Sequence, residues 1–199
     1  MSKDKYTIEE HQHRLACWAA SRSAAASPYC RFSVETGNNL LKDIGISEDW
    51  ALPATVEEFE KWHEDSCKKL MDIAQKNEEY VFSGKAKTEK QPKERFAYGV
   101  AAKLINCYIK VRFVHPSSKR ASLVFIHPPI DRLLLSGLYD HDKKCAEVKE
   151  FAPKWKKYLD IGWSNFQEEA YKAVIDAVKS RVGEKPLWTI ERYWEGMQK

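Results

Sequence analysis

One lysine and one carboxylate in this sequence could carry chemistry together. Lys103 follows a turn of small residues, 99–102, just inside a segment that the hydrophobic pattern predicts to be a helix. Asp131 follows a Pro-Pro-Ile sequence at the start of the next apolar segment. In an apolar pocket a lysine can lose its proton and attack carbon as a neutral amine. A buried carboxylate beside it can direct protons and stabilise a developing cation.

Each of the two residues also has an interpretation without catalysis. A lone lysine in an apolar helix often extends its side chain so that the ammonium reaches solvent. An aspartate after Pro-Pro-Ile is often a first-turn carboxylate, which is favourable against the helix dipole. The catalytic interpretation makes the stronger claim. It requires Lys103 and Asp131 to face one cleft, because the reacting group of a substrate must lie near both.

The sequence around the two residues resembles the helix-hairpin-helix DNA glycosylases. In that family a Gly-Val-Gly-x-Lys turn enters a helix, and a Pro-Val-Asp segment follows. The residues that match the turn are Gly99, Val100 and Lys103, with Ala101 in place of the second glycine. Residues 129–131, Pro-Ile-Asp, are similar to the second segment. The resemblance covers about the middle third of the chain, and the long interval between lysine and aspartate is similar to the archaeal 8-oxoguanine glycosylase branch.

The resemblance implies a DNA glycosylase, a hydrolase of N-glycosyl bonds that flips a modified base out of double-stranded DNA and leaves an abasic site. Lys103 would attack C1′ and form a Schiff base, which permits a lyase step. Asp131 would stabilise the positive charge on the deoxyribose. The implied substrate is a hypermodified cytosine of phage DNA, excised in antiviral defence, or 8-oxoguanine in repair. We favour the first, because the small chain and degenerate hairpin differ from a housekeeping repair enzyme.

Other residues would hold the DNA. Residues 83–95 combine glycine, proline and several lysines, which predicts an exposed basic loop that is either a solvated connector or a phosphate contact. The predicted DNA contacts are Gly99, Lys85, Lys87, Lys90, Lys119 and Arg120. A flipped base also needs a pocket with stacking side chains. The candidates for that pocket are Trp18, His127 and Trp188.

Two other functions remain open. Arg120 and His127 have the spacing of the Arg-x4–6-His motif of helical ribonucleases of the HEPN type, whose Arg and His act on the 2′-OH and phosphate of RNA. A non-enzymatic helical module that binds nucleic acid would use the basic loop and would not need Lys103. His11 and His13 point to different faces of a helix, so we predict no metal site and no cofactor.

Composition limits the class of protein. The 199 residues are 43% hydrophobic and 31% charged, which suits one globular domain. The net charge of +4 permits an acidic partner such as DNA without requiring one. Five cysteines without a Cys-x-x-Cys pair favour a reducing compartment. The sequence lacks a signal peptide and a long apolar run, so we expect a cytoplasmic, nucleoid-associated monomer with no membrane contact.

The hydrophobic pattern predicts an all-α fold with two helical lobes around a cleft, as in a degenerate helix-hairpin-helix glycosylase. The lobes would be residues 1–82 and 96–199 of a single domain, joined by the basic loop 83–95. Residues 96–114 form the most apolar predicted helix, which should be central. The other predicted helices run from Thr7 to about Ala26, from about Cys30 to Ile44, from Thr55 onward, from Pro129 through Leu138, from Ser164 to about Gly183, and from Pro186 onward.

Overall fold

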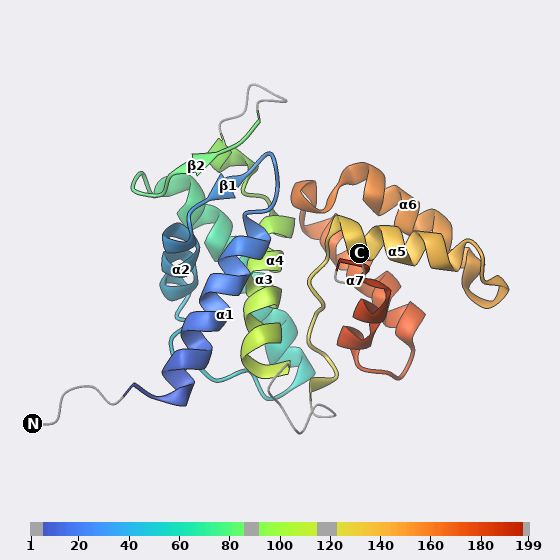
Figure 1. The fold of residues 1–199 in the computed structure, drawn as a ribbon, viewed down its shortest axis with the longest axis horizontal. Helices are drawn as coiled ribbons and strands as arrows, with labels where there is room; N and C mark the ends of the chain where they lie inside the picture. The colour runs from blue at the N-terminus through green and yellow to red at the C-terminus, as the bar shows by residue number, and fades with distance from the viewer. Residues whose placement is uncertain (1–5, 86–91, 115–122, 197–199) are drawn as a thin grey trace, which may run out of the picture.

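The computed structural model describes residues 6–85, 92–114 and 123–196, which form an all-α fold (Figure 1). The α-helices are α1 (Ile8–Ala24), α2 (Val34–Asp43), α3 (Val56–Lys76), α4 (Tyr98–Ile109), α5 (Arg132–Asp142), α6 (Ala152–Ile161) and α7 (Glu168–Val182). Short helical segments connect them: η1 (Pro92–Arg95), η2 (Lys110–Val114), η4 (Ala146–Phe151), η5 (Trp163–Asn165) and η6 (Leu187–Tyr193). Strands β1 (Arg31–Phe32) and β2 (Phe82–Ser83) pair antiparallel. The prediction of an all-α fold is confirmed.

Local sequence signals define where helices begin. The Thr55 hydroxyl accepts a hydrogen bond from the Glu58 N–H, and the Glu58 carboxylate accepts one from the Thr55 N–H. This reciprocal pair is a capping box, and α3 begins where a helix is predicted from Thr55 onward. Thr7 likewise caps α1 by accepting a hydrogen bond from the Glu10 N–H.

Several predicted helices differ from the structure, and one helix was not predicted. The helices expected from Pro129 and from Ser164 begin at Arg132 and Glu168. The helix expected from Cys30 begins only at Val34, because Ser33 caps α2 and the preceding residues are extended in β1. The last predicted helix is the 3-10 segment η6. Helix α6 was missed, although Pro153 stands in its first turn, where proline is tolerated.

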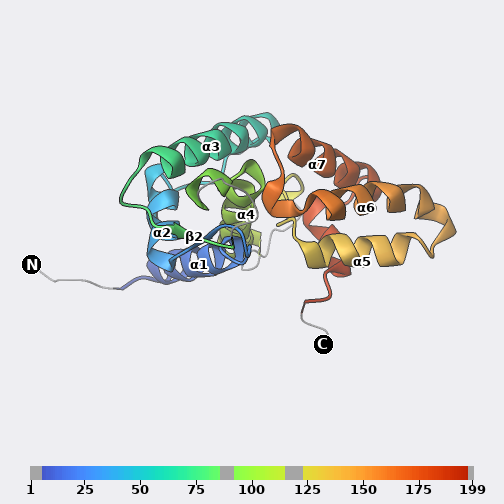
Figure 2. The ribbon, with the colours of Figure 1, turned by 90° about the horizontal axis from the view of Figure 1, so that it is seen from above.

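The central helix is α4, as its apolar sequence predicts. All its residues from Tyr98 to Ile109 are buried, and it packs between α1 and α3 (Figure 2). Helical structure continues through the π-helical segment η2. Because α4 is surrounded by protein, each polar side chain on it must meet a polar partner or face a pocket.

The remaining helices, α5 to α7, gather on the other side of α4 from α2 (Figure 1). Since α4 packs mainly against α1 and α3, it belongs with the N-terminal helices, although it follows the basic loop. The predicted division of the chain at residues 83–95 therefore does not match the packing. The chain crosses to the second group of helices before Asp131, the N-cap of α5. Lys103 and Asp131 thus belong to different groups of helices. Within the described ranges, no helix is long and apolar enough to cross a bilayer.

Candidate active site

Lys103 and Asp131 meet where α4 approaches the start of α5. The Lys103 ammonium lies 3.3 Å from Asp131 Oδ2. The Lys103 side chain is only 7% exposed and that of Asp131 is 17% exposed. The lysine is therefore not a surface residue whose ammonium extends into bulk solvent. The two residues share one pocket, as the catalytic interpretation requires.

Three donors hold the Asp131 carboxylate in place. Its Oδ1 accepts a hydrogen bond of 2.9 Å from the Leu134 N–H, so Asp131 is also the helix-capping residue that the simpler interpretation describes. Its Oδ2 accepts hydrogen bonds from Lys103 and from the indole N–H of Trp194, which is 3.2 Å away. Both oxygens are thus engaged as acceptors. A fixed carboxylate of this kind is suited to stabilise a cation that forms beside it.

The Lys103 ammonium is also in contact with an aromatic ring. It lies 4.2 Å from the centre of the Trp163 ring, a cation–π arrangement. Gly99 makes this possible, because a Cβ at that position would lie 2.0 Å from the Trp163 carbonyl oxygen. The Gly99 N–H donates to the Phe166 carbonyl. Gly99 was predicted to contact DNA, but it is buried and its N–H is used inside the fold.

The segment before Lys103 is not a short loop between two helices. Residues 77–97 separate α3 from α4 and include β2 and η1. The N–H groups of Val100 and Ala101 both donate to the Ala97 carbonyl. These donors close the first turn of α4 rather than pointing outward to a phosphate. The resemblance therefore lies in the residues of the lysine turn, while the backbone before the turn takes a different course.

A pocket of 320 Å³ lies at Lys103 and Asp131. One wall carries only small side chains, Ala19 and Ser23 of α1 and Ala26 just after it. The opposite side is formed by α4, η2, the segment before α5, and the end of η6. The other lining residues are Cys107, Lys110, Val111, Pro129, Glu191 and Trp194. This volume is at the lower end of the range for small-molecule sites.

The same pocket holds a second ammonium–carboxylate pair. Lys110 lies two helical turns after Lys103, on the same face of the helix. Its ammonium donates a hydrogen bond to Glu191 Oε2. Burial raises the pKa of the Glu191 carboxyl, and the positive charge of Lys110 opposes this rise without cancelling it. Sequence analysis missed Glu191, because nothing near it in the chain marks it.

None of the three residues predicted for the base pocket lines it. Trp18 lies on α1 and is 54% exposed, and Trp188 packs against the core. His127 lies at a different pocket. The aromatic residues beside the lysine–aspartate pair are Trp163 and Trp194 instead.

The predicted phosphate contacts are described only in part. Lys85 is exposed, and its main chain is bound to Pro28 and Arg95. The other predicted contacts, Lys87, Lys90, Lys119 and Arg120, lie outside the described residues. Two basic residues that sequence analysis missed are chain neighbours of residues that line the pocket. Arg22 precedes Ser23 on α1, Arg132 follows Asp131, and both side chains are exposed.

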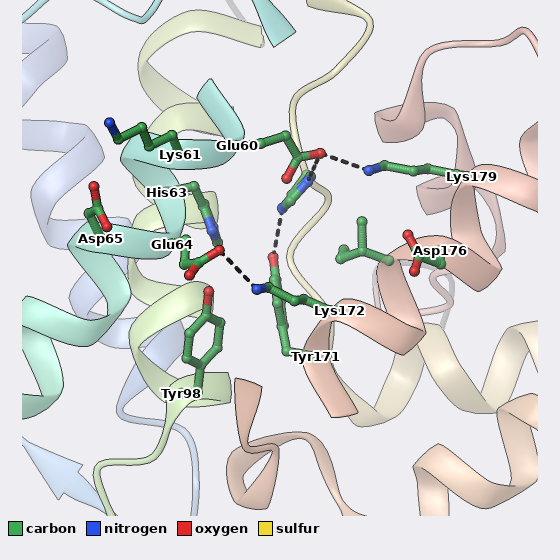
Figure 3. Close-up of a pocket in the computed structure, with 12 residues that line it drawn as sticks. Glu60, Lys61, His63, Glu64, Asp65, Tyr98, Tyr171, Lys172, Asp176 and Lys179 are labelled. Carbon is green, nitrogen blue, oxygen red and sulfur yellow. Dashed lines mark hydrogen bonds and ion pairs between the residues drawn. The ribbon is translucent and has the colours of Figure 1, made fainter. Parts of the chain in front are cut away.

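A second polar cluster lies between α3 and α7, at a pocket of 570 Å³ (Figure 3). Figure 3 shows Glu60 and Glu64 of α3 reaching across to Lys179 and Lys172 of α7. These ion pairs span 2.7 Å and 2.8 Å. Burial alone would raise the pKa of Glu60, but hydrogen bonds from His127 and Lys179 outweigh it and lower the pKa to about 2.

Hydrogen bonds in this cluster form one chain with a single consistent direction. The Glu60 carboxylate can only accept, so His127 Nε2 carries the proton across the 3.2 Å contact. His127 Nδ1 lies 3.0 Å from the Tyr171 hydroxyl, which can donate to it. The Tyr171 oxygen accepts from Asn106 Nδ2, whose amide oxygen accepts from His63 Nε2. Burial lowers the pKa of His63 to about 3, so this ring is neutral near pH 7.

This network leaves no ring nitrogen of His127 available for catalysis. Both nitrogens are engaged, and the side chain is 3% exposed. Arg120, its partner in the predicted ribonuclease motif, lies outside the described residues. The geometry of His127 is that of a buried structural histidine and gives no support to the ribonuclease alternative.

Among the residues that the structure describes, no three His, Cys, Asp or Glu side chains are placed to hold a metal ion. Comparison of the chain with protein-family models, with curated proteins and with solved structures gave no match. Function must therefore be inferred from the site itself and from the residues that resemble the glycosylase motifs.

Proposed function

We propose that this protein is a DNA glycosylase that excises a modified base, with Lys103 as nucleophile and Asp131 as the stabilising carboxylate. The observation that carries the proposal is the 3.3 Å contact between Lys103 Nζ and Asp131 Oδ2 in a pocket. Packing of two separate groups of helices brings together the two residues that resemble the family's catalytic pair. A purely structural ion pair would not need a pocket beside it.

The chemistry follows from the charges at the site. Cleavage of the N-glycosidic bond sends its electrons to the base and builds positive charge on the deoxyribose, which the Asp131 carboxylate would stabilise. Lys103 must be neutral to attack C1′, so its amine must first lose a proton to water, while Asp131 stays ionised beside it. After the sugar ring opens, the lysine nitrogen and C1′ form a Schiff base.

The surroundings of the pair suit a flipped base. The small side chains of α1 leave space beside Lys103 for a flat ring, and Trp194 supplies an aromatic wall. Arg22 and Arg132 make no ion pair with any described residue, so they are available to DNA phosphates at the rim. Hypermodified cytosine and 8-oxoguanine remain the two substrates to test first.

The proposal is tested by incubating the protein with duplexes that carry glucosylated hydroxymethylcytosine, 8-oxoguanine or no modification. Released base is measured directly, and sodium borohydride is added in parallel to reduce a Schiff base to a stable cross-link. We expect base release from one modified duplex and a cross-link that maps to Lys103. Lys103→Gln should abolish both signals, while Lys76→Gln, a change at an exposed lysine at the end of α3, should abolish neither.

Two results would contradict different parts of the proposal. Base release without a cross-link, retained in Lys103→Gln, would show a monofunctional glycosylase with water as nucleophile and would remove Lys103 from its role. Salt-dependent DNA binding without release from any modified duplex would overturn the enzymatic proposal and favour the non-enzymatic binding module.

A further inference from the structure

The two carboxylates of the Lys103 pocket have different surroundings. Asp131 accepts hydrogen bonds on both oxygens, from Leu134, Lys103 and Trp194. A proton placed on this carboxyl group would displace one of these donors. Asp131 is therefore arranged to act as an anion and is poorly placed to act as an acid.

Glu191 is arranged in the opposite way. In the described part of the chain its carboxyl group has one hydrogen-bond partner, the Lys110 ammonium, on Oε2. Its Oε1 can carry a proton without displacing any donor. The side chain is 16% exposed and lines the same pocket as Asp131. Two carboxyl groups whose environments differ in this way commonly divide the roles of acid and anion in an active site.

Trp194 joins the two pairs into one site. Its indole N–H donates to Asp131, and its main-chain N–H donates to the Glu191 carbonyl. Its ring centre lies 5.7 Å from the Lys110 ammonium. Because Trp194 bonds the Asp131 carboxylate and the Glu191 main chain, and both acidic residues line one pocket, a base that enters beside Asp131 also comes near Glu191.

We infer that Glu191 is the general acid that protonates the departing base and that Lys110 positions it, an inference that rests on the proposed glycosylase function. As the bond between C1′ and the base nitrogen breaks, its electron pair goes to the base. The Glu191 Oε1 proton moves to the base in the same step. The Glu191 carboxylate that remains is stabilised by the Lys110 ammonium, and it regains a proton from water after the base leaves.

An abasic duplex separates this role from a structural one. It presents an aldehyde at C1′ and has no base to expel, so Schiff-base formation on it needs Lys103 but no proton donor for a leaving base. We expect Glu191→Gln to slow single-turnover base release by about 10²–10⁴-fold and to trap on the abasic duplex as fast as the wild type. The isosteric amide oxygen can still accept from Lys110. Glu195→Gln, at an exposed carboxylate nearby, is the matched control and should change neither rate.

The pH dependence of base release gives a second measurement. A general acid must be protonated, so the wild-type rate should fall as pH rises through the pKa of Glu191, and Glu191→Gln should lack this alkaline limb. Lys110→Gln should shift the limb to higher pH, because the positive charge that favours the Glu191 anion is removed.

Three results would overturn the inference. Glu191→Gln with wild-type base release would show that no acid is needed there. Equal slowing on the abasic and the base-containing duplex would show that Glu191 only supports Lys103. An alkaline limb that persists in Glu191→Gln would assign the acid to another group. If the wild type releases no base at all, the glycosylase proposal itself fails, and this inference falls with it.

Discussion

Two polar regions of the molecule each receive a side chain from α4. One is the pocket at Lys103, and the other is the hydrogen-bond network that runs from His63 to Glu60. They differ in whether every polar group has a hydrogen-bond partner. In the network, every side-chain donor from His63 to His127 meets an acceptor, and the chain ends on the ion pair of Glu60 with Lys179. In the pocket, Glu191 keeps an oxygen without a described partner. A completed network stabilises one arrangement, whereas charged groups around an open pocket are a reason to expect chemistry.

Among the variants that compare these two regions, Asp131→Asn is expected to have the largest effect. The change removes the negative charge and should slow base release by about 10²–10³-fold, as for other groups that stabilise transition-state charge. Asparagine caps helices as well as aspartate does, so α5 keeps its start. Some stability is lost because Lys103 loses its counter-ion. Single-turnover rates are therefore compared at a temperature where circular dichroism shows both proteins folded. A wild-type rate in this variant would place Asp131 among the structural residues.

Tyr171→Phe tests whether the hydrogen-bond network stabilises the fold without taking part in catalysis. Loss of the hydroxyl leaves His127 Nδ1 without its donor, which should reduce the free energy of unfolding by about 1–3 kcal/mol. Urea denaturation measures this loss, and Tyr139→Phe on α5 is the matched control, expected to stay within about 0.5 kcal/mol of wild type. The folded Tyr171→Phe protein should release base at the wild-type rate. Lost release in a folded variant would make the network part of the active site.

Sequence analysis succeeded where the signal is local. The helix start at Thr55 and the apolar run of α4 depend on neighbouring residues, so both were predicted correctly. The contact between Lys103 and Asp131 was predicted because the motif that each residue matches implies a role beside one sugar. The start of α2 was misplaced because pairing with β2 keeps Arg31 and Phe32 extended.

The rest of the site depends on tertiary packing that the sequence does not display. Glu191 lies in the short 3-10 segment η6 and Trp194 directly follows it, and only the fold brings them to the Lys103 pocket. His127 was assigned to the base pocket because its position in the chain does not reveal which pocket it faces. Gly99 was assigned to DNA, whereas its role is to let Trp163 approach α4.

Acid should weaken the network before it affects the carboxylates. His63 has a pKa of about 3 when folded and an ordinary value of 6.5, so the unfolded chain binds more protons between these limits. The free energy of unfolding should therefore fall as pH drops below 6.5, with a limiting slope of about 1.4 kcal/mol per pH unit for one proton. His63→Gln keeps an N–H for Asn106 and does not titrate, so urea midpoints should vary less with pH above 4.5. An unchanged pH dependence would show that His63 is not the titrating group.

The smallest effect should be a change in the salt dependence of DNA binding. Arg22 and Arg132 are chain neighbours of residues that line the pocket, and alanine at either position should reduce the slope of log K against log salt by about 0.9 if it removes one phosphate contact. Lys172→Ala is the control and should leave the slope unchanged, because Lys172 already pairs with Glu64 and Glu168. Fluorescence anisotropy with an unmodified duplex over a salt series measures each slope.

A triple alanine variant at Lys85, Lys87 and Lys90 tests the basic loop in the same assay, and an unchanged slope there would make the loop a solvated connector. Equal slopes for Arg22→Ala, Arg132→Ala and Lys172→Ala would mean that DNA does not approach over the Lys103 pocket, which would remove the physical distinction between the two regions.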